Sequence, residues 1–574
     1  MNDTRKPPRF PLAGQTETHP LETLALWALG AAVSAGAVLW LTGEVSARLF
    51  AGSWPRVSIT EMGAVVARFG SHASNPAAAW PAPARILLPG PAAFYGTLVV
   101  LVGVAAAVAF LVWRRTSGAA RPASARWART SDLRALRVRR PQAGRLTLGR
   151  VDGHLIAAER RQSVIVIGPV QTGKTSGFAV PAILEWQGPV LATSVKTDLL
   201  RETFGARASL PDGEVWVYDP TGGTGLPAAG WTPLAECSSW RGAQRVASWL
   251  VGAARRGGPG IENAQFWYGA AEKLLAPLLL AAAHSDGTMA DVVRWVDKQE
   301  EEQVRWGLEL AGDDAASTAF SATTMRDERT RSNVYATTET VLAAFADPSV
   351  LASAAISDLR AERLLDGRRH TAFLCAPAHE QRRLQPLFAT LVQEIVAAAY
   401  ERATETGKPI DPPLLLVLDE CANIAPLREL ATLASTGAGQ GIQLVSVFQD
   451  MAQINAVYGR DRAPTIVSNH RAKVILSGVA DAQTLDYVGR LLGDEEVRQV
   501  SSTTGAEGRR STTEATSYRT LAPANLLREM RPGQGVLVYG HLPPARISLR
   551  PWFRDRRLRR LAVGAAPQPV GTAG

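Results

Sequence analysis

The chain has 574 residues, of which 46% are hydrophobic and 20% are charged, and its formal net charge at pH 7 is +10. Its 3 cysteines cannot cross-link so long a chain, so a disulfide-built secreted scaffold is excluded, and its hydrophobic content excludes general disorder. The length corresponds to about three or four domains. The positive charge fits acidic partners, but the dominance of Arg beside abundant Ala, Gly and Pro equally fits a GC-rich coding bias.

Two apolar stretches near the N-terminus, residues 23–43 and 92–113, predict membrane-spanning helices. Neither contains a charged residue, and each is long enough to cross ~30 Å of hydrocarbon. A signal peptide fits the first poorly because the apolar run is too long and no cleavage site follows it. A buried core helix fits the second poorly because that stretch has no polar face. We therefore expect residues 1–129 to form a membrane anchor with two helices.

Basic residues flank these two stretches unevenly. Several Lys and Arg residues precede the first stretch, and many Arg residues follow the second. The loop between the two stretches holds only Arg48, Arg56, Arg68 and Arg85. The positive-inside rule then places both termini and everything after the second stretch in the cytoplasm, in a multi-pass protein of the inner membrane. The cysteines would lie in a reducing compartment, where we expect them to be ordinary buried residues: Cys237, Cys375 and Cys421.

The cytoplasmic part begins with segments whose sequence is typical of β-strands. Short alternating segments at residues 133–138, 145–151 and 154–159 predict a small antiparallel hairpin. Residues 163–168 form a continuous apolar run, which is typical of a buried parallel strand. That run leads into GPVQTGKT at residues 168–175, and apolar residues with helical spacing follow. The pattern G-x-x-x-x-G-K-[ST] between a strand and a helix predicts a P-loop.

The P-loop has a direct chemical meaning. Gly168 and Gly173 let the backbone turn so that its N–H groups face phosphate, and Lys174 supplies a positive charge to the β- and γ-phosphates. The Thr175 hydroxyl is placed to bind Mg²⁺. The alternative is a chance match in a Gly-rich chain, which the flanking strand and helix disfavour. We expect ATP to be held by Gly168, Pro169, Val170, Gln171, Thr172, Gly173, Lys174, Thr175 and Ser176.

An acidic pair follows another predicted strand. The apolar run at residues 414–418 ends in Asp419 and Glu420. Asp419 would hold Mg²⁺ together with Thr175, and Glu420 would orient or deprotonate the attacking water. The alternative is a strand that merely ends in polar residues.

A further strand is predicted at residues 441–449, after a glycine-rich turn with the sequence STGAGQG. It ends in Gln449, which would sense the γ-phosphate and complete a catalytic set with Lys174 and Glu420. A structural amide is the alternative for this side chain.

The remaining segments predict a layered α/β domain. Strands at residues 472–478 and 535–540 complete a central sheet with right-handed crossovers. The P-loop and the acidic pair lie about 245 residues apart in the chain. Between them, the apolar residues of 237–366 recur at helical spacing, which predicts an all-α insertion. Its charge run at 297–302 is expected to be a solvated helix face. The nucleotide-binding domain would then comprise residues 130–236 and 367–560.

Two segments are expected to lack regular structure. Residues 501–517 have no periodicity and predict a mobile loop, and residues 561–574 predict a disordered tail.

The motifs together resemble the TraG/TraD-like coupling proteins of type IV secretion systems. Besides the two apolar stretches and the P-loop, the matching segments in chain order are VLATSVKTDLL, VWVYDPTG, WTPL, LDECANIAPL and QLVSVFQDMAQINAVYG. The match runs from about residue 20 to residue 553, so it covers nearly the whole chain.

The resemblance implies a RecA-like P-loop NTPase domain with an inserted all-α domain, preceded by two transmembrane helices. It also implies a homo-hexameric ATP hydrolase that uses Mg²⁺, is stimulated by DNA and binds DNA independently of sequence. Such a protein would drive DNA or a DNA–relaxase complex into a conjugative secretion channel. Its implied partners are DNA, relaxase or relaxosome proteins, secretion channel components and the membrane.

The chain departs from the family at two places. Ser194 and Val195 stand where relatives often have Asp-Pro, although Lys196 is retained. Ala438 falls near the position of an Arg that relatives could use in trans, which leaves the arginine finger open. The weak substitutes are Arg460, Arg462 and Arg471.

Basic residues in the last part of the chain could contact DNA phosphates in a salt-sensitive, sequence-independent way. A solubilising or membrane-proximal basic tail is the alternative. These residues are Arg509, Arg510, Arg554, Arg556, Arg557, Arg559 and Arg560. Two other functions also stay open: an FtsK-like double-stranded DNA translocase, which would usually have more spans and a C-terminal DNA-reading domain, and a nucleotide-binding membrane receptor for secreted proteins.

Overall fold

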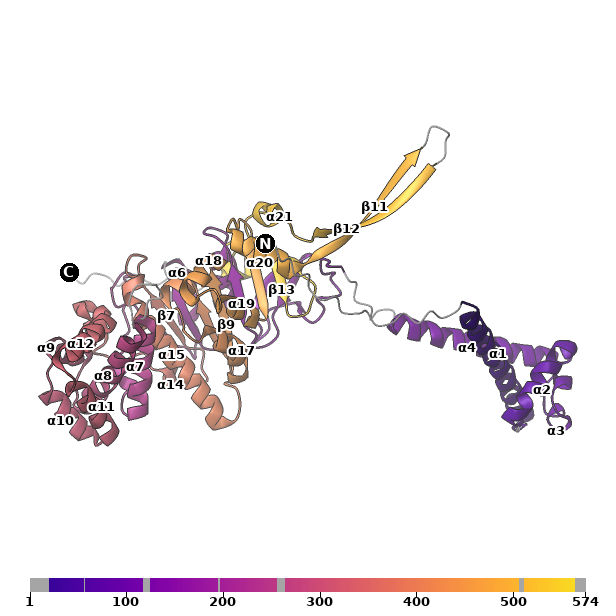
Figure 1. Ribbon diagram of the computed structural model, residues 1–574, viewed down its shortest axis with the longest axis horizontal. Coiled ribbons are helices and arrows are strands. Elements are labelled where there is room, and N and C mark those ends of the chain that lie inside the picture. The colour runs from indigo at the N-terminus through magenta and orange to yellow at the C-terminus, as the bar shows by residue number, and fades with distance from the viewer. Residues whose placement is uncertain are drawn as a thin grey trace, which may run out of the picture. The chain divides into compact units, whose positions relative to one another are not determined.

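The computed structural model describes residues 20–55, 57–116, 124–194, 197–254, 264–504 and 510–562. Within its helices and strands, the side chains of residues 20–33, 59, 113–116, 501–504 and 510–513 are not described. The chain divides into two compact units, Met1–Ala123 and Ser124–Gly574 (Figure 1).

The first unit consists of two long helices and a folded segment between them. The long helices are α1 (Pro20–Ala51) and α4 (Pro91–Thr116), and α2 (Ile59–Phe69) and α3 (Ala82–Arg85) lie between them in the chain. The fully buried Trp80 packs edge-to-face against Phe94, with the ring centroids 5.3 Å apart. A Cβ added to Gly43 would lie 2.6 Å from the Trp80 ring, so only glycine admits this contact. The segment therefore packs directly on α1.

Within the described residues, one stretch is long and apolar enough to cross a membrane. It is Pro91–Val112 of α4, with a mean hydropathy of 2.4, and it agrees with the predicted span at 92–113. The predicted span at 23–43 falls in α1, partly on residues whose side chains lie outside the description. That span stays a prediction.

The second unit is built on one large mixed sheet. In the part of the chain that the structure describes, twelve strands follow the order β1-β3-β2-β14-β13-β10-β4-β9-β8-β5-β7-β6. The strands from β10 to β6 in this order are parallel, and the others extend the sheet in antiparallel pairs. Their bounds are β1 Arg137–Val138, β2 Thr147–Val151, β3 His154–Ala157, β4 Val164–Ile167, β5 Val190–Ser194, β6 Val215–Tyr218, β7 Thr371–Cys375, β8 Leu414–Leu418, β9 Ile442–Phe448, β10 Ala472–Leu476, β13 Gln534–Tyr539 and β14 Ala545–Ser548.

The strand predictions are largely confirmed. β4, β8, β9, β10 and β13 lie within or next to the apolar runs that predicted a central sheet. The predicted hairpin is the pair β2–β3, and through β14 it joins the same sheet. Residues 133–136 form a turn before the two-residue strand β1, so that part of the prediction was wrong.

Helices cover both faces of the sheet, with a hydrophobic core on each side. Alternate residues of β8 point to opposite faces, so Leu416 belongs to one core cluster and Leu415 to the other. The helices that accompany the sheet are α5 Val180–Glu185, α6 Thr197–Ala208, α15 Gln381–Thr406, α16 Cys421–Ile424, α17 Leu430–Gln440, α18 Met451–Tyr458, α19 Ala463–Asn469, α20 Ala482–Leu492, α21 Ala524–Glu529 and α22 Arg556–Ala562.

From Trp240 onward the described residues between β6 and β7 are mainly helical, as predicted for the insertion. They include α7 Trp240–Ala254, α8 Ala264–His284, α9 Met289–Lys298, α10 Glu302–Ala311, α11 Asp314–Thr324, α12 Glu328–Leu342, α13 Pro348–Ser353 and α14 Ala361–Leu364. The charge run at 297–302 is not one helix face, because Gln299 adopts a left-handed conformation with φ of 51° and ends α9. The charges therefore lie at a corner between two helices.

Two loop predictions were wrong. Most of 501–517 belongs to a long antiparallel ribbon of β11 (Asp494–Thr504) and β12 (Arg510–Thr520), which projects from the sheet domain (Figure 1). The two strands are held together by backbone hydrogen bonds. Such bonds do not depend on residue type, so the sequence of the ribbon shows no hydrophobic periodicity. The predicted glycine-rich turn is the C-terminal part of α17, which continues to Gln440 and ends at Gly441 with φ of 90°.

Candidate functional site

The predicted P-loop joins β4 to the helix that follows it. Gly173 has φ of 89°, a left-handed conformation that glycine tolerates without strain. A Cβ on Gly168 would lie 2.8 Å from Leu476 Cβ, so the loop can pass β10 only because this residue is glycine. After the loop, Thr175–Ala179 form a π-helical turn that continues into α5.

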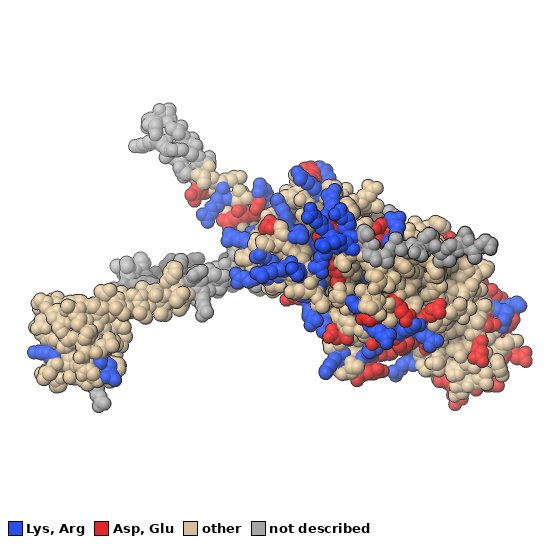
Figure 2. Space-filling model, turned by 180° about the vertical axis from the view of Figure 1, so that it is seen from behind, with Lys and Arg blue, Asp and Glu red and all other residues tan. Residues whose placement is uncertain are grey.

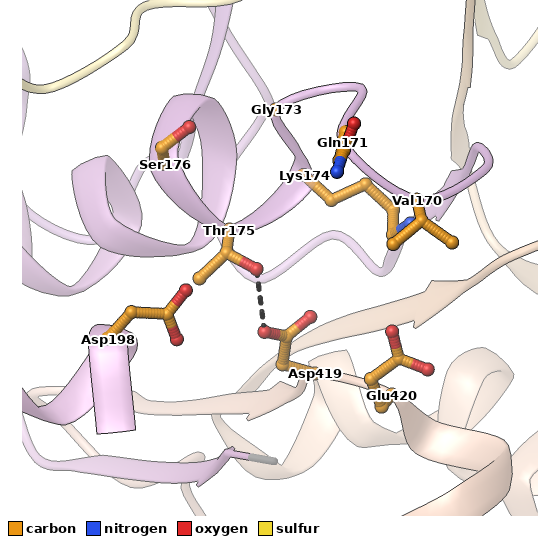
Figure 3. A pocket seen from close by; sticks show the side chains of 9 residues that line it. All are labelled: Val170, Gln171, Gly173, Lys174, Thr175, Ser176, Asp198, Asp419 and Glu420. Atoms are coloured by element: carbon orange, nitrogen blue, oxygen red, sulfur yellow. Dashed lines mark hydrogen bonds between the residues drawn. The ribbon is translucent and has the colours of Figure 1, made fainter. Parts of the chain in front are cut away.

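The loop forms one wall of a cavity of about 290 Å³. The opposite wall comes from the carboxyl end of β8 and the start of α6 (Figure 3). Ligands bind at this end of the strands in open α/β sheets. The lining residues are Val170, Gln171, Gly173, Lys174, Thr175, Ser176, Asp198, Asp419 and Glu420.

Lys174 is buried within the loop itself. Its Nζ donates hydrogen bonds to the backbone oxygens of Gly168 (2.6 Å) and Pro169 (2.8 Å). These carbonyls hold a positive charge at the wall of the cavity, where a phosphate would be attracted to it.

Asp419 is the buried acidic group of the site. The Thr175 hydroxyl donates to Asp419 Oδ2 at 3.0 Å, and the Thr193 hydroxyl donates to the backbone oxygen of Asp419, also at 3.0 Å. Among the described residues, Asp419 Oδ1 is buried without a hydrogen-bond partner. Burial raises the pKa of Asp419 to about 6, although the hydrogen bond from Thr175 acts in the opposite direction.

These two side chains fit Mg²⁺. A carboxylate oxygen without a partner and a hydroxyl oxygen are hard ligands of the kind that Mg²⁺ prefers beside nucleotide phosphates. A bound cation would also stabilise the ionised form of Asp419 that burial disfavours.

Glu420 stands at the junction of β8 and α16 in a left-handed conformation, with φ of 54° and ψ of 46°. For a residue with a side chain this conformation is strained by ~1 kcal/mol or more. Its Oε2 accepts hydrogen bonds from Asn423 Nδ2 (3.2 Å) and Gln449 Nε2 (3.1 Å). The carboxylate lines the cavity in a fixed orientation.

Gln449 is brought to the site but does not line the cavity. Its side-chain amide donates to Glu420, and its backbone N–H donates to Gln453 Oε1 at 2.9 Å. In this structure the amide therefore orients Glu420, and the γ-phosphate role stays a prediction.

Three of the loop residues predicted to bind ATP do not line the cavity: Gly168, Pro169 and Thr172. The Thr172 hydroxyl instead donates to the Pro169 backbone oxygen at 2.8 Å, a bond that shapes the loop.

One cavity residue was missed by the sequence analysis. Asp198, in the first turn of α6, faces Thr175 across the cavity (Figure 3). Its charge helps to raise the pKa of Asp419. The sequence held a signal for Asp198, because this acidic residue closely follows the apolar run of β5. The carboxyl end of β5 lies beside that of β8, with which it pairs.

The arginine-finger positions lie away from the cavity within the chain. Ala438 is half-buried in α17. Arg462 donates to the Arg428 backbone oxygen, and Arg471 forms an ion pair with Glu159 at 3.2 Å. Neither these arginines nor Arg460 lines the cavity. Four other residues named from the sequence lie outside the described residues: Arg56, Val195, Lys196 and Arg509.

Comparison with known families gives a consistent result. A family model described as "Type IV secretory system Conjugative DNA transfer" matches residues 115–569. The chain is 26% identical over 340 residues to the conjugal transfer protein TraG of Escherichia coli, covering 54% of this chain and 52% of that protein. It is 24% identical over 476 residues to protein VirD4 of Agrobacterium fabrum, covering 78% of this chain and 68% of that protein. The matched region thus spans about half of the TraG relative.

Solved structures with the same fold include bacterial conjugative coupling protein TrwBdeltaN70. Its unbound form has a TM-score of 0.59 and 19% identity, covering 75% of this chain and 93% of that one. Plasmid coupling protein TrwB in complex with ADP and Mg²⁺ has a TM-score of 0.58 and 20% identity, covering 78% and 96% of the two chains. These likenesses confirm the predicted α/β P-loop NTPase fold with a helical domain.

Proposed function

The chain belongs to the type IV secretory system conjugative DNA transfer family, and on this premise we propose that it is a membrane-anchored coupling ATPase. It would use ATP hydrolysis to drive DNA or a DNA–relaxase complex into a conjugative secretion channel. The observation that carries the proposal is the cavity that joins Lys174, the Thr175–Asp419 pair and Glu420. TrwB is described in complex with an ATP analogue and with ADP and Mg²⁺, which supports ATP and Mg²⁺ as the ligands here.

Each side chain has a separate task in this proposal. The loop N–H groups and Lys174 bind the phosphates. Thr175 and Asp419 would hold Mg²⁺, which neutralises phosphate charge when it is bound. Glu420, fixed by Asn423 and Gln449, orients the attacking water and accepts its proton.

The wider arrangement is part of the same proposal. Residues 130–236 and 367–560 form the motor domain, and residues 237–366 form an inserted helical domain. The chain assembles as a homo-hexamer in the inner membrane, with two spans, both termini in the cytoplasm, and relaxosome proteins and channel components as partners. The long apolar helix α4 supports the membrane anchor.

Hydrolysis by the full-length chain in nanodiscs tests the proposal. ATPase activity is measured alone, with single-stranded DNA and with double-stranded DNA, for the wild type and for Lys174→Ala. We expect Mg²⁺-dependent activity that DNA stimulates and that Lys174→Ala abolishes.

Activity that ignores DNA would favour a receptor for secreted proteins, and activity that survives Lys174→Ala would reject the site. A plasmid-transfer assay with the same variant in the host separates a coupling protein from a chromosome translocase, because only the former is needed for transfer.

A further inference from the structure

The C-terminal segment, residues 549–562, forms backbone hydrogen bonds with the π-helical turn Thr175–Ala179 that follows the P-loop. The backbone N–H of Trp552 donates to the Ser176 oxygen at 3.0 Å, and that of Arg550 donates to the Gly177 oxygen at 3.3 Å. A Cβ on Gly177 would lie 3.0 Å from Leu549 Cβ, so the two segments approach closely. Ser176 also lines the nucleotide cavity, so this segment directly contacts a residue of the candidate phosphate site.

A buried ion-pair network fixes the same segment to the far end of α5. The Arg550 side chain is only 5% exposed and bonds Glu185 at 2.9 Å and Asp555 at 3.0 Å. The Thr147 hydroxyl also donates to Glu185, at 2.7 Å. Buried charges of this kind are costly to separate, so the network holds the segment firmly against α5.

Beyond this network the segment becomes strongly basic. Leu558 of α22 is fully buried in the same core cluster as Phe178 and Ala182 of the P-loop helix. The outward side chains are arginines, and within the described residues none of them forms an ion pair with a carboxylate. They are Arg554, Arg556, Arg557, Arg559 and Arg560.

An exposed aromatic residue stands beside these arginines. Phe553 is 47% exposed and packs edge-to-face on Trp552, with the ring centroids 6.0 Å apart. The Arg554 guanidinium lies 5.8 Å from the centre of the Phe553 ring. Figure 2 shows that Lys and Arg side chains also gather over other parts of the surface of the second unit.

We propose that the five arginines contact the DNA phosphates and Phe553 stacks on a base, and that the segment transmits this contact to the turn after the P-loop through Trp552 and Arg550. The inference rests on the proposed DNA-driven function and assigns a contact site to it. Arginines beside an exposed aromatic ring fit a phosphate backbone with bases that stack. The apolar face of α22 is packed into the protein core, so contact with an anionic membrane would be electrostatic only and would leave the exposed Phe553 ring without a role.

The contact is tested on the full-length chain in neutral-lipid nanodiscs with a labelled single-stranded oligonucleotide. The variant replaces four arginines by glutamine: Arg556→Gln, Arg557→Gln, Arg559→Gln and Arg560→Gln. We expect DNA affinity to fall by about tenfold or more, and the slope of log affinity against log salt to become shallower by about 3. Basal ATPase activity should not change, and stimulation by DNA should be lost.

A matched control removes the same charge elsewhere, at Arg241, Arg329, Arg382 and Arg402, which are exposed and lie on other helices. An equal loss of DNA affinity in the control would overturn the proposed site, since the effect would then be general electrostatics. Stimulation by anionic-lipid nanodiscs that depends on the α22 arginines, with DNA binding unchanged, would show a membrane contact and overturn it as well.

The transmission step has its own test. Arg550→Met should leave DNA binding intact and abolish stimulation. Hydrogen exchange of residues 175–186 in the wild type gives a second readout, and DNA should slow it. If DNA neither binds to nor stimulates the wild type, the proposed function fails. If the wild type is stimulated and both variants behave like it, only this inference fails.

Discussion

Arg207 and Asp419 are two of the charged groups buried in the second unit, and their hydrogen bonding differs. Arg207 of α6 donates from Nε to Thr371 Oγ1 (2.7 Å) and from its other nitrogens to the backbone oxygens of Trp186 (2.9 Å) and Gly188 (2.8 Å). Burial lowers its pKa to about 10, so it stays charged at pH 7. Asp419, by contrast, keeps one buried oxygen without a partner among the described residues.

The difference separates a structural charge from a charge prepared for a ligand. Arg207 joins the ends of neighbouring strands and turns, and its bonds are complete in the protein alone. Asp419 lacks a bond that a bound cation would supply, so its burial is a cost for the protein on its own. Substitutions at these two places should therefore affect stability and activity in opposite ways.

The largest effect is expected at Glu420. Glu420→Gln keeps the size of the side chain but removes the proton acceptor, so hydrolysis should fall by about 10²–10⁴-fold. Nucleotide affinity and thermal stability should stay close to those of the wild type. Single-turnover hydrolysis and equilibrium binding of a fluorescent nucleotide measure the two quantities. Retained hydrolysis would move the proton acceptor to another residue.

Arg207→Met tests the structural half of the comparison. It leaves several buried carbonyls without donors, and we expect a loss of about 3–5 kcal/mol in the free energy of unfolding. Denaturant unfolding of the chain in detergent measures the loss. Arg201→Met, at an exposed position on the same helix, is the control and should cost little.

Asp419→Asn should do the reverse and stabilise the nucleotide-free protein. Because the pKa of Asp419 rises from 3.8 to about 6 on folding, its ionisation costs the folded state roughly 3 kcal/mol above pH 6. The variant should gain part of that energy near pH 8 and nothing near pH 4, where the native carboxyl is already protonated. Melting curves at both pH values measure this.

The same variant should lose Mg²⁺-dependent nucleotide binding. In the wild type that binding should weaken as the pH falls through about 6, since the carboxyl then takes up a proton. A pH-independent Mg²⁺ affinity would contradict the assignment of Asp419 as a cation ligand.

Gln449→Ala should give the smallest effect. If the amide only orients Glu420, its removal should lower the hydrolysis rate by about tenfold, with nucleotide affinity unchanged. Gln449→Glu is the sharper variant, because a second carboxylate would repel Glu420. An effect of Gln449→Ala as large as that of Glu420→Gln would favour the γ-phosphate role instead.

The residues that could be predicted from the sequence lie in local motifs. The P-loop and the Asp419–Glu420 pair each occupy a few consecutive positions at a strand end, so their geometry follows from local chain direction. Arg207 could not be predicted in this way, because its acceptors come from two connections far apart in the chain, before β5 and before β7, that only the folded sheet brings together.

The C-terminal segment shows the same limit. Its contact with the P-loop turn joins residues separated by more than three hundred positions, and it is made by backbone atoms that carry no sequence signature. The β11–β12 ribbon was mistaken for a loop for a related reason. Its strands pair with each other and not with a core, so no alternation of apolar and polar residues marks them.

The left-handed backbone of Glu420 has an evolutionary consequence. A glycine or asparagine would occupy this conformation at a lower energy, so selection for thermal stability alone would favour replacement of the glutamate. Selection for a working motor would oppose that replacement at every generation. A mutant library screened only for heat resistance should therefore accumulate inactive chains with changes at this codon, and sequencing that library would reveal which requirement maintains the residue.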